Sequence, residues 1–391
     1  MSKNKKSKVF IIGFYGCHNI GDEAILTGIL ESLNETGHSF EVRALSHNPK
    51  HTEEIHQIKG VKQSLHKGFL RMLFFEWFGI LKSIFWADIL FLGGGSLVHD
   101  LRFYNLPILL GACIFGKLLG KKTVLYGCGV GPITTKLGKW CCRNLLGRFD
   151  LITVRDERGV KWLKDAGVKK EIVQTVDPAF AWIGKKSLLS PEQLLDQENI
   201  PVDREFIGIT VSGWFKSDNF WQKNKLNFSR EVKDMLKIMN ETIKRYNKDL
   251  IFLTTVFPAD KEMALRLKKE SDFPERVWVI ENEYDPVSIT NLFNKIDFLI
   301  GMRLHSLIFA TMMEVPFCTM VYDQKVENFL KMTGMSQYSI SLENFNPEKF
   351  LKIIEKTSHD KIKIKQHLHN VARKFKNVAL ENGKLVERLI K

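Results

Sequence analysis

The chain has 391 residues, 44% of them hydrophobic, with 58 Lys and Arg against 44 Asp and Glu, which gives a formal net charge of +14. This length and composition exclude a small disulfide-stapled scaffold and a disordered chain, and they predict two domains. The six cysteines form no C-x-x-C pair and no Cys/His cluster at zinc-ligand spacing, so we expect reduced core thiols and no metal site.

The N-terminus, MSKNKKSKVFIIGFYG, runs from a basic stretch into a short apolar strand and a glycine turn. It lacks the longer apolar region and the cleavage site of a signal peptide, so we expect a cytoplasmic protein. Residues 69–92 and 104–120 are apolar. Charged residues interrupt the first stretch, and the second is shorter than the roughly 20 residues that a membrane span needs.

About half of the net charge lies after Pro347, where 12 Lys and Arg stand against 5 Asp and Glu in a helical pattern. Such a charge attracts anionic substrates, nucleic acid or an anionic membrane surface and does not choose among them. No basic patch is interleaved with aromatic residues, so we predict no nucleic-acid partner.

Strands and helices alternate along the chain, which predicts parallel sheets covered on both faces. In the first half the predicted strands are 8–12, 40–46, 89–92, 123–126 and 151–154, and residues 22–36 carry a helical apolar repeat. Residues 182–204 are polar and contain two prolines, which indicates a linker. In the second half the predicted strands are 206–212, 250–255, 277–280, 298–301 and 316–321, with helices at 228–246 and 259–271.

We therefore predict an α/β protein with two Rossmann-like, doubly wound domains that face a central cleft, which is the glycosyltransferase-B arrangement. The expected parts are an N-terminal domain at 1–185, a second domain at 203–345 and basic C-terminal helices at 346–391. Ligands of such sheets bind at the carboxyl ends of the strands.

The first glycine turn, GFYGCHNIGDEAI at 13–25, joins a strand to a helix whose free N–H groups can bind an anion. Its spacing differs from the G-x-G-x-x-G fingerprint, which disfavours a nicotinamide cofactor. Asn19 and Asp22 lie beside the turn. Asp22 is either a helix cap or a carboxylate that takes a proton from a sugar hydroxyl.

Two more glycine turns follow predicted strands. Gly93, Gly94 and Gly95 weaken local order, so they indicate either a tight packing turn or a sugar or phosphate close to the backbone, with Ser96 or Asp100 as polar contacts. The third turn, GCGVGPI at 127–133, lies at the same predicted sheet edge. Three such turns define a site better than one.

In the second half, GMRLHSLIFA at 301–310 delivers Arg303, His305 and Ser306 to a turn between a strand and a helix. Arg303 can bind a carboxylate or phosphate through two parallel hydrogen bonds. His305 can donate to a phosphate or transfer a proton near neutral pH. A lone Arg or His here would be a core or capping residue, but the combination favours a ligand site. Three residues after the next strand are candidates for closing this pocket: Tyr322, Asp323 and Lys325.

Six motifs, in this order, resemble the polysaccharide pyruvyl transferases: GFYGCHNIGDEAIL, LFLGGGSLVHD, GCGVGPI, TVRDERG, DPAF and GMRLHSLIFA. The resemblance covers residues 9–326. It implies transfer of the enolpyruvyl unit of phosphoenolpyruvate, as co-substrate, to a sugar as a cyclic ketal, with release of phosphate and without a metal or another cofactor. It also implies a sugar acceptor that is part of a lipid-linked polysaccharide precursor.

The resemblance assigns roles to residues of this chain. His305 is the candidate acid and Asp22 the candidate base. The R-L-H match carries Arg303, Leu304 and His305 over as donor contacts, and the residues around them add Ser306, Lys216 and Lys325 as further candidates. The candidate acceptor contacts, around the glycine turns, are Gly16, Asn19, Gly94, Gly95, Ser96, Asp100 and Gly129.

Two places leave alternatives open, one that matches the family and one that departs from it. Arg155 and Asp156 match the T-V-R-D turn and are either functional or a brace of the domain interface. Many relatives have an arginine where this chain has Ser212, and Lys216 is the candidate replacement for its charge.

Residues 65–86 form a broad apolar face with Lys67, Arg71 and Lys82 nearby, which suits either a helix on a membrane surface or a core helix. We therefore keep a peripheral contact with the inner face of the membrane as an alternative. Two other functions remain open on the same fold. One is a nucleotide-sugar glycosyltransferase that uses Arg303 for the diphosphate, and the other is a non-catalytic binding protein.

Overall fold

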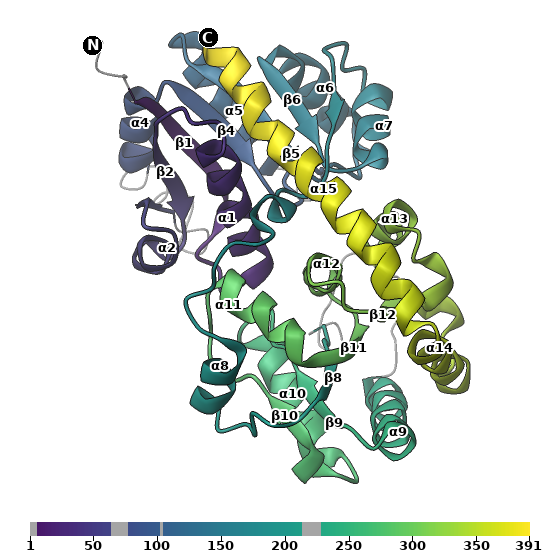
Figure 1. The fold of residues 1–391 in the computed structure, drawn as a ribbon. Coiled ribbons are helices and arrows are strands. Elements are labelled where there is room, and N and C mark those ends of the chain that lie inside the picture. Colours follow the sequence, from purple (N-terminus) through teal and green to yellow (C-terminus); the bar gives the residue numbers. More distant parts are fainter. Residues whose placement is uncertain (1–5, 64–76, 102–104, 213–227) are drawn as a thin grey trace. The chain divides into compact units, whose positions relative to one another are not determined.

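The computed structural model describes residues 6–63, 77–101, 105–212 and 228–391. The chain divides into two compact units, Met1–Trp182 with Phe375–Lys391 and Ile183–Lys374. Each unit is built on one parallel sheet with helices packed around it (Figure 1). None of the described helices combines the length and the apolar character that a membrane span requires.

The sheet of the first unit has seven strands in the order β3-β2-β1-β4-β5-β6-β7, and every pairing is parallel. The strands are β1 Ser7–Tyr15, β2 Phe40–Ser46, β3 Lys59–Lys62, β4 Ile89–Gly93, β5 Lys122–Cys128, β6 Leu151–Val154 and β7 Val173–Gln174. The helices described around it are α1 Ile20–Asn34, α2 Pro49–His56, α4 Trp77–Trp86, α5 Asn105–Leu118, α6 Lys136–Asn144 and α7 Glu157–Asp165.

The sheet of the second unit has six strands in the order β10-β9-β8-β11-β12-β13, again all parallel. The strands are β8 Phe206–Ile209, β9 Asp249–Phe252, β10 Val277–Val279, β11 Ile296–Gly301, β12 Phe317–Val321 and β13 Ser339–Ser341. The helices are α8 Pro191–Gln197, α9 Phe228–Tyr246, α10 Ala259–Glu270, α11 Pro286–Asn291, α12 Leu304–Met312, α13 Gln324–Thr333 and α14 Pro347–His359. Helix α15, Lys361–Ile390, begins in this unit and ends in the first.

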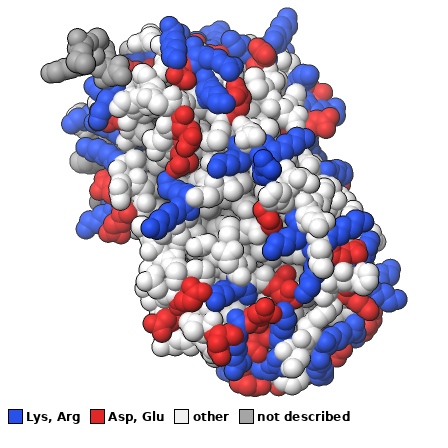
Figure 2. Space-filling view, viewed as in Figure 1, with Lys and Arg blue, Asp and Glu red and all other residues white. Residues whose placement is uncertain are grey.

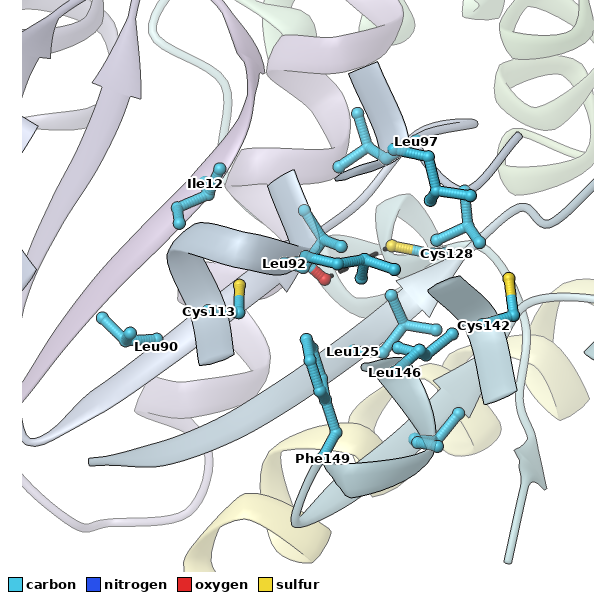
Figure 3. Close-up of a cluster of buried hydrophobic side chains, with 14 of the residues drawn as sticks. Ile12, Leu90, Leu92, Leu97, Cys113, Leu125, Cys128, Cys142, Leu146 and Phe149 are labelled. Atoms are coloured by element: carbon cyan, nitrogen blue, oxygen red, sulfur yellow. Dashed lines mark hydrogen bonds between the residues drawn. The ribbon is translucent and has the colours of Figure 1, made fainter. Parts of the chain in front are cut away.

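One face of the first sheet packs against α5 and α6 in a dense apolar core, which Figure 3 shows. Cys113 of α5, Cys128 of β5 and Cys142 of α6 lie in this core, and all six cysteines of the chain are free thiols. Burial raises the pKa of the Cys113 and Cys128 thiols to about 12, so both stay protonated. These cysteines behave as small core hydrophobes, as the sequence predicts.

The predicted linker at 182–204 is not a bare connection, because it contains α8. Ser190 and Gln193 form a capping box at the start of this helix, in which each side chain accepts a hydrogen bond from the other residue's backbone. The dipeptide Ser190-Pro191 therefore begins a helix of the second unit and does not mark a flexible joint.

The basic C-terminal helices do not form a part of their own. Helix α14 packs on the second unit, whereas the end of α15 joins the first. Phe375 meets Phe180 edge-on with ring centroids 5.1 Å apart, and Val386 is fully buried in the core beside β1 and β4. On the face drawn in Figure 2, Lys and Arg are interspersed with Asp and Glu, so the excess positive charge does not form one patch there.

Gly383 of α15 gives a test of this packing. A methyl group at this position would collide with the backbone carbonyl of Ser32 in α1. We expect Gly383→Ala to lower the free energy of unfolding by about 1–3 kcal/mol, because the overpacking outweighs the gain in helix propensity. Urea unfolding measures the effect.

Gly111 of α5 is the matched control, because it is also helical but an added methyl there meets nothing within 4 Å. Gly111→Ala should raise the free energy of unfolding by about 0.5–1 kcal/mol through helix propensity alone. Equal stability of the two variants would contradict the close contact between α15 and α1.

Candidate functional site

Both sheets reverse their strand order beside their first strand. In the first unit β1 lies between β2 and β4, and in the second unit β8 lies between β9 and β11. Loops that leave the carboxyl ends of neighbouring strands diverge at such a switch point, and ligands of doubly wound folds bind in the crevice between them. The glycine turns after β1 and β4 and the turn after β11 therefore occupy the expected places.

Asn19, and not Asp22, caps helix α1. The side-chain oxygen of Asn19 accepts a hydrogen bond from the N–H of Gly21 at 3.1 Å, and its amide donates to Asp22 Oδ2 at 2.6 Å. The helix-cap interpretation of Asp22 is therefore wrong. The other oxygen, Asp22 Oδ1, lies 3.2 Å from where a Cβ on Gly95 would stand, so this carboxylate faces the triple-glycine turn.

The glycines of both turns are required by close approaches. Gly16, Gly94 and Gly95 have φ of +70°, +72° and +64°, a region that side chains disfavour. A Cβ on Gly94 would collide with Ile25 of α1, and one on Gly16 would collide with Ser46 at the end of β2. The turns after β1 and β4 are therefore packed directly against α1 and β2. Gly16 and Gly94 are needed for this tight packing, whether or not a ligand also approaches the turns.

Glu23 fixes the first glycine turn, a role that the sequence motifs did not predict. Glu23 is buried, and its Oε1 accepts the N–H of Gly16 at 2.7 Å while its Oε2 lies 2.7 Å from Nε2 of His56 in α2. An acidic residue within the apolar repeat of α1 was the available signal. Glu23 holds the backbone of the turn in place and leaves Asp22 as the carboxylate at the sheet edge.

Cys17 in the same turn is not a nucleophile at neutral pH. Burial raises the pKa of its thiol to about 12, and the carboxylates of Asp22 and Glu23 add to this effect. The thiol therefore remains protonated beside the candidate base.

Arg155, after β6, joins three turns of the same edge. Its Nη1 donates to Asp177 at 2.9 Å and its Nη2 donates to the hydroxyl of Ser96 at 3.0 Å. Its guanidinium also fills the space where a Cβ of Gly129 would stand. Burial lowers the pKa of Arg155, but Asp177 and Asp156 outweigh this and raise it. Arg155 therefore braces the edge of the first unit, and Gly129 is small to admit it.

Two further predicted contacts have structural partners of their own. Asp156 caps α7 by accepting the N–H of Gly159 at 2.7 Å. Asp100 Oδ2 accepts the N–H groups of Thr134 and Thr135, at 2.7 and 2.5 Å, and so holds the loop before α6. Among the polar acceptor candidates, Ser96 is the one whose side chain is exposed.

In the second unit Arg303 stands where α12 begins, directly after β11. Its Nε and Nη2 donate to the two oxygens of Asp260, at 3.2 and 2.5 Å. Burial lowers the pKa of Arg303, but Asp260 and then Tyr322 outweigh this and raise it. The Arg303 side chain is 23% exposed and that of Asp260 only 2%. A guanidinium has five N–H groups, so Asp260 fixes its direction and leaves donors for a ligand.

Asp260 itself is a residue that the sequence analysis missed. It lies in the first turn of α10, and its Oδ2 also accepts the hydroxyl of Thr255 at 3.0 Å and the N–H of Val256 at 3.1 Å. These bonds tie the loop after β9 to the turn after β11. The loop after β12 contributes Tyr322, so the loops that follow β9, β11 and β12 surround Arg303.

Ser306 contradicts its predicted role as a donor contact. Its side chain is fully buried, its hydroxyl donates to the carbonyl of Arg303 at 2.7 Å, and Thr210 lies 2.8 Å away. Thr210 Oγ1 in turn accepts the N–H of Met302 at 3.1 Å. The two hydroxyls therefore join the end of β8 to the start of α12 and hold the Arg303 turn.

The remaining donor candidates lie nearby. Leu304 and His305 lie in the first turn of α12. The ring centroids of His305 and Phe309 are 6.3 Å apart. Lys325 lies beside Asp323, with Nζ 3.4 Å from a carboxylate oxygen, and Ser212 is buried. Lys216 lies outside the described residues. Among the described residues, no group of His, Cys, Asp and Glu has the arrangement of a metal site.

The structure thus gathers Asp22, Gly95, Ser96 and Arg155 at the edge of one sheet. It gathers Arg303, Asp260 and His305 around the start of α12 in the other unit. The pairing of Asp22 with His305 across the expected cleft stays a prediction.

Comparison with known proteins decides the family. A family model described as polysaccharide pyruvyl transferase matches residues 19–324. The chain belongs to the polysaccharide pyruvyl transferase family. It is also similar to the amylovoran biosynthesis protein AmsJ of Erwinia amylovora, with 20% identity over 379 residues that cover 86% of this chain and 88% of that protein.

Solved structures agree on the fold of this pyruvyl transferase family member. A glycosyltransferase from Rickettsia africae has a TM-score of 0.61 at 13% identity and covers 99% of both chains. A structure described as a UDP-N-acetylglucosamine 2-epimerase from Listeria monocytogenes has a TM-score of 0.60 at 16% identity, covering 96% of this chain and 94% of that one. The expected glycosyltransferase-B fold of two parallel-sheet α/β domains is confirmed.

The reactivity of Cys17 tests whether the Asp22 carboxylate faces this thiol. Cys17 suits the test because it is the only one of the six cysteines that is not buried. We expect the native protein to react slowly with a thiol reagent at pH 8. Asp22→Asn should speed this reaction several-fold, because removing the negative charge lowers the pKa of the Cys17 thiol. Stopped-flow absorbance with a chromogenic disulfide measures the rate.

Cys17→Ser should abolish the reaction if Cys17 is the thiol that reacts. Glu54 is an exposed acidic residue of α2, so Glu54→Gln is the matched control for the loss of one negative charge. An unchanged rate in Asp22→Asn would show that this carboxylate does not face Cys17.

Asp260 is expected to position Arg303 for the donor. Asp260→Asn removes the charge that directs the guanidinium, so we expect the Kd for phosphoenolpyruvate to rise by about tenfold or more, the value of one charge-assisted hydrogen bond. Isothermal titration calorimetry measures it.

Asp249→Asn is the matched control. Asp249 is also buried and paired with two arginines, Arg204 and Arg276, but it lies at the amino end of β9, away from the strand ends that surround Arg303. Both variants should lose stability, and only Asp260→Asn should lose donor affinity. Equal Kd values for phosphoenolpyruvate in the two variants would show that Asp260 does not position the donor.

Proposed function

We propose that this protein transfers the pyruvyl unit of phosphoenolpyruvate to a sugar of a lipid-linked polysaccharide precursor, forming a cyclic ketal and releasing phosphate. The observation that carries the proposal is the Arg303–Asp260 pair at the switch point of the second unit, in a chain of this family. The name of AmsJ, which refers to amylovoran biosynthesis, supports a polysaccharide as acceptor.

The donor carries a carboxylate and a phosphate, and the start of α12 suits such an anion. Arg303 offers N–H donors in a fixed direction, and the N-terminal turn of α12 adds free backbone N–H groups and the positive end of the helix dipole. Because Asp260 neutralises Arg303, the pair supplies orientation more than net charge. The helix end and His305 then contribute the remaining stabilisation of the anion.

The reaction needs an acid and a base. Protonation of the methylene carbon of the donor, by His305 in this proposal, leaves an oxocarbenium-like carbon that a sugar hydroxyl attacks. The C–O bond to phosphate breaks, and a second hydroxyl of the same sugar forms the second C–O bond of the ketal. Of the two hydroxyl protons released, one restores the acid and the other leaves with the phosphate.

Asp22 is the proposed base for the sugar hydroxyl. Asn19 holds one of its oxygens, and the other faces the backbone of Gly95, which has no side chain of its own. The hydroxyl of Ser96, oriented by Arg155, is the neighbouring polar contact. The proposed acceptor is part of a lipid-linked precursor, and the proposed location of the enzyme is the cytoplasm, at the inner face of the membrane.

Thermal-shift titration tests the donor. Phosphoenolpyruvate should raise the melting temperature, because a ligand that binds only the folded state stabilises it. Arg303→Ala should abolish the shift, while Arg266→Ala, an exposed arginine of α10 in a surface ion pair, should keep it. Stabilisation by nucleotide sugars alone would overturn the proposal in favour of a glycosyltransferase.

Asp22→Asn separates binding from turnover. The variant should keep the thermal shift with phosphoenolpyruvate. Its rate of phosphate release in the presence of acceptor should fall by at least about 100-fold, because a general base usually contributes that much. Retained turnover in this variant would exclude Asp22 as the base. Retained cellular function in a variant without turnover would favour the binding-protein alternative.

A further inference from the structure

Two consecutive helices of the first unit, α4 and α5, carry large apolar residues on the side that faces away from the sheet, and the next helix, α6, adds Trp140 among three exposed cations. Their inner residues, such as Ile84, Leu110 and Cys142, are fully buried in the core. Large side chains on their outer side are exposed to solvent: Phe78 and Phe85 of α4, Ile108, Phe115 and Leu118 of α5, and Trp140 of α6. A helix that is apolar nearly all round, as α4 and α5 are, is ordinarily buried, so the exposure of these two helices indicates a surface with a partner.

The outer residues of α4 and α5 form one continuous surface. The rings of Phe85 and Phe115 meet edge-on at 6.2 Å between centroids. Beside them lies an open apolar groove of about 380 Å³, lined by Leu81 of α4 and by Pro107, Ile108, Gly111, Ala112 and Phe115 of α5. We call the outer face of α4, α5 and α6 the α4–α6 surface.

The charge of the α4–α6 surface has one sign. The three helices contain no Asp or Glu. Among the residues that the structure describes, their one ion pair joins Lys117 to Asp150 at 2.8 Å. Four further cations are exposed: Lys82, Lys136, Lys139 and Arg143. Helices of the second unit such as α9 and α10 instead carry both signs and several ion pairs along their surfaces.

We propose that the α4–α6 surface binds the surface of an anionic phospholipid bilayer. Large apolar side chains would enter the boundary between head groups and acyl chains, and the surrounding lysines would contact lipid phosphates. Such binding leaves the protein peripheral, and none of the described helices is both long enough and apolar enough to span a bilayer. The inference builds on the proposed lipid-linked acceptor, but its physical basis lies in this surface alone.

A second copy of the chain fits this surface less well. A two-fold dimer would place the same patch against itself and would therefore bring Lys82, Lys139 and Arg143 close to the same cations of the partner copy. Like charges at an interface oppose association, whereas anionic head groups complement them. Charge complementarity thus favours the bilayer.

Co-sedimentation of the full-length protein with vesicles tests the proposal. Binding is expected to vesicles of phosphatidylglycerol and phosphatidylcholine, to weaken with added NaCl, and to be much weaker for phosphatidylcholine alone. Phe78→Gln with Leu118→Gln should reduce partitioning by about tenfold or more, because two buried apolar groups are lost. Lys82→Glu with Lys139→Glu should remove the preference for the anionic lipid.

The matched control is Leu188→Gln with Ile362→Gln. These residues of the second unit are 80% and 72% exposed, against 73% for Phe78 and 79% for Leu118, so all four substitutions should be equally mild for folding. The control should bind vesicles like the unchanged protein. Equal loss in both double variants, or no binding to anionic vesicles, would overturn the proposal.

Light scattering tests whether a second copy of the chain, and not a bilayer, binds the α4–α6 surface. The inference would be overturned if the unchanged protein is a dimer that does not bind vesicles and if Phe78→Gln with Leu118→Gln dissociates this dimer. The α4–α6 surface would then bind a second copy of the chain. Because the vesicles contain neither donor nor acceptor, failure of this experiment leaves the thermal shift with phosphoenolpyruvate, and thus the proposed transfer reaction, untouched.

Discussion

The parallel direction of every strand is the constraint on which this structure depends. In a parallel sheet all carboxyl ends meet at one edge, and each connecting helix must return the chain to the opposite edge. Because both sheets begin in the middle and grow first to one side and then to the other, each has one point where neighbouring loops diverge. Asp22 and Gly95 flank that point in the first unit, and Arg303 follows the strand that forms it in the second.

Both units place a buried arginine–carboxylate pair at this edge, but they use it differently. Taking two charges out of water costs several kcal/mol per ion, and pairing only offsets this, so such a pair contributes position more than stability. Arg155 is nearly inaccessible and meets Asp177, Ser96 and Gly129, so it seals the edge and sets the Ser96 hydroxyl. Arg303 keeps part of its surface exposed, so the same type of pair there presents donors to a ligand.

Sequence reasoning recovered the repeating architecture because strand ends in this chain are marked by glycine or by charged turns. The bounds of α9 and of β2 agree with the predicted ranges, and only short edge strands such as β3, β7 and β13 were missed. Their two to four residues carry too little apolar pattern to be recognised. The family resemblance, carried by six motifs in order, is confirmed.

The details of the site were less accessible, for physical reasons. Asn19 and Asp22 are both good capping residues three positions apart, and only the backbone conformation decides which one caps. Ser306 follows the periodicity of α12 into the core, where Thr210 satisfies its hydroxyl, and the pattern of polar residues alone suggested a ligand contact. Asp260 is 43 residues from Arg303, so no local pattern could have joined them. The return of α15 to the first unit is likewise a matter of tertiary packing.

The orientation of the helices links the proposed membrane surface to the proposed acceptor site within the first unit. Helices α4 and α5 each lead to a strand that begins at the amino edge, so their N-terminal ends lie toward the carboxyl edge that carries the glycine turns. Pro107 and Ile108, which line the apolar groove, belong to the first turn of α5, which follows the turn of Gly94, Gly95 and Ser96 along the chain. A bilayer bound at the α4–α6 surface would therefore lie beside helices whose N-terminal ends point toward the edge where Asp22 stands. The same parallel topology that forms the site would then also orient the acceptor, because it fixes both ends of every crossover helix.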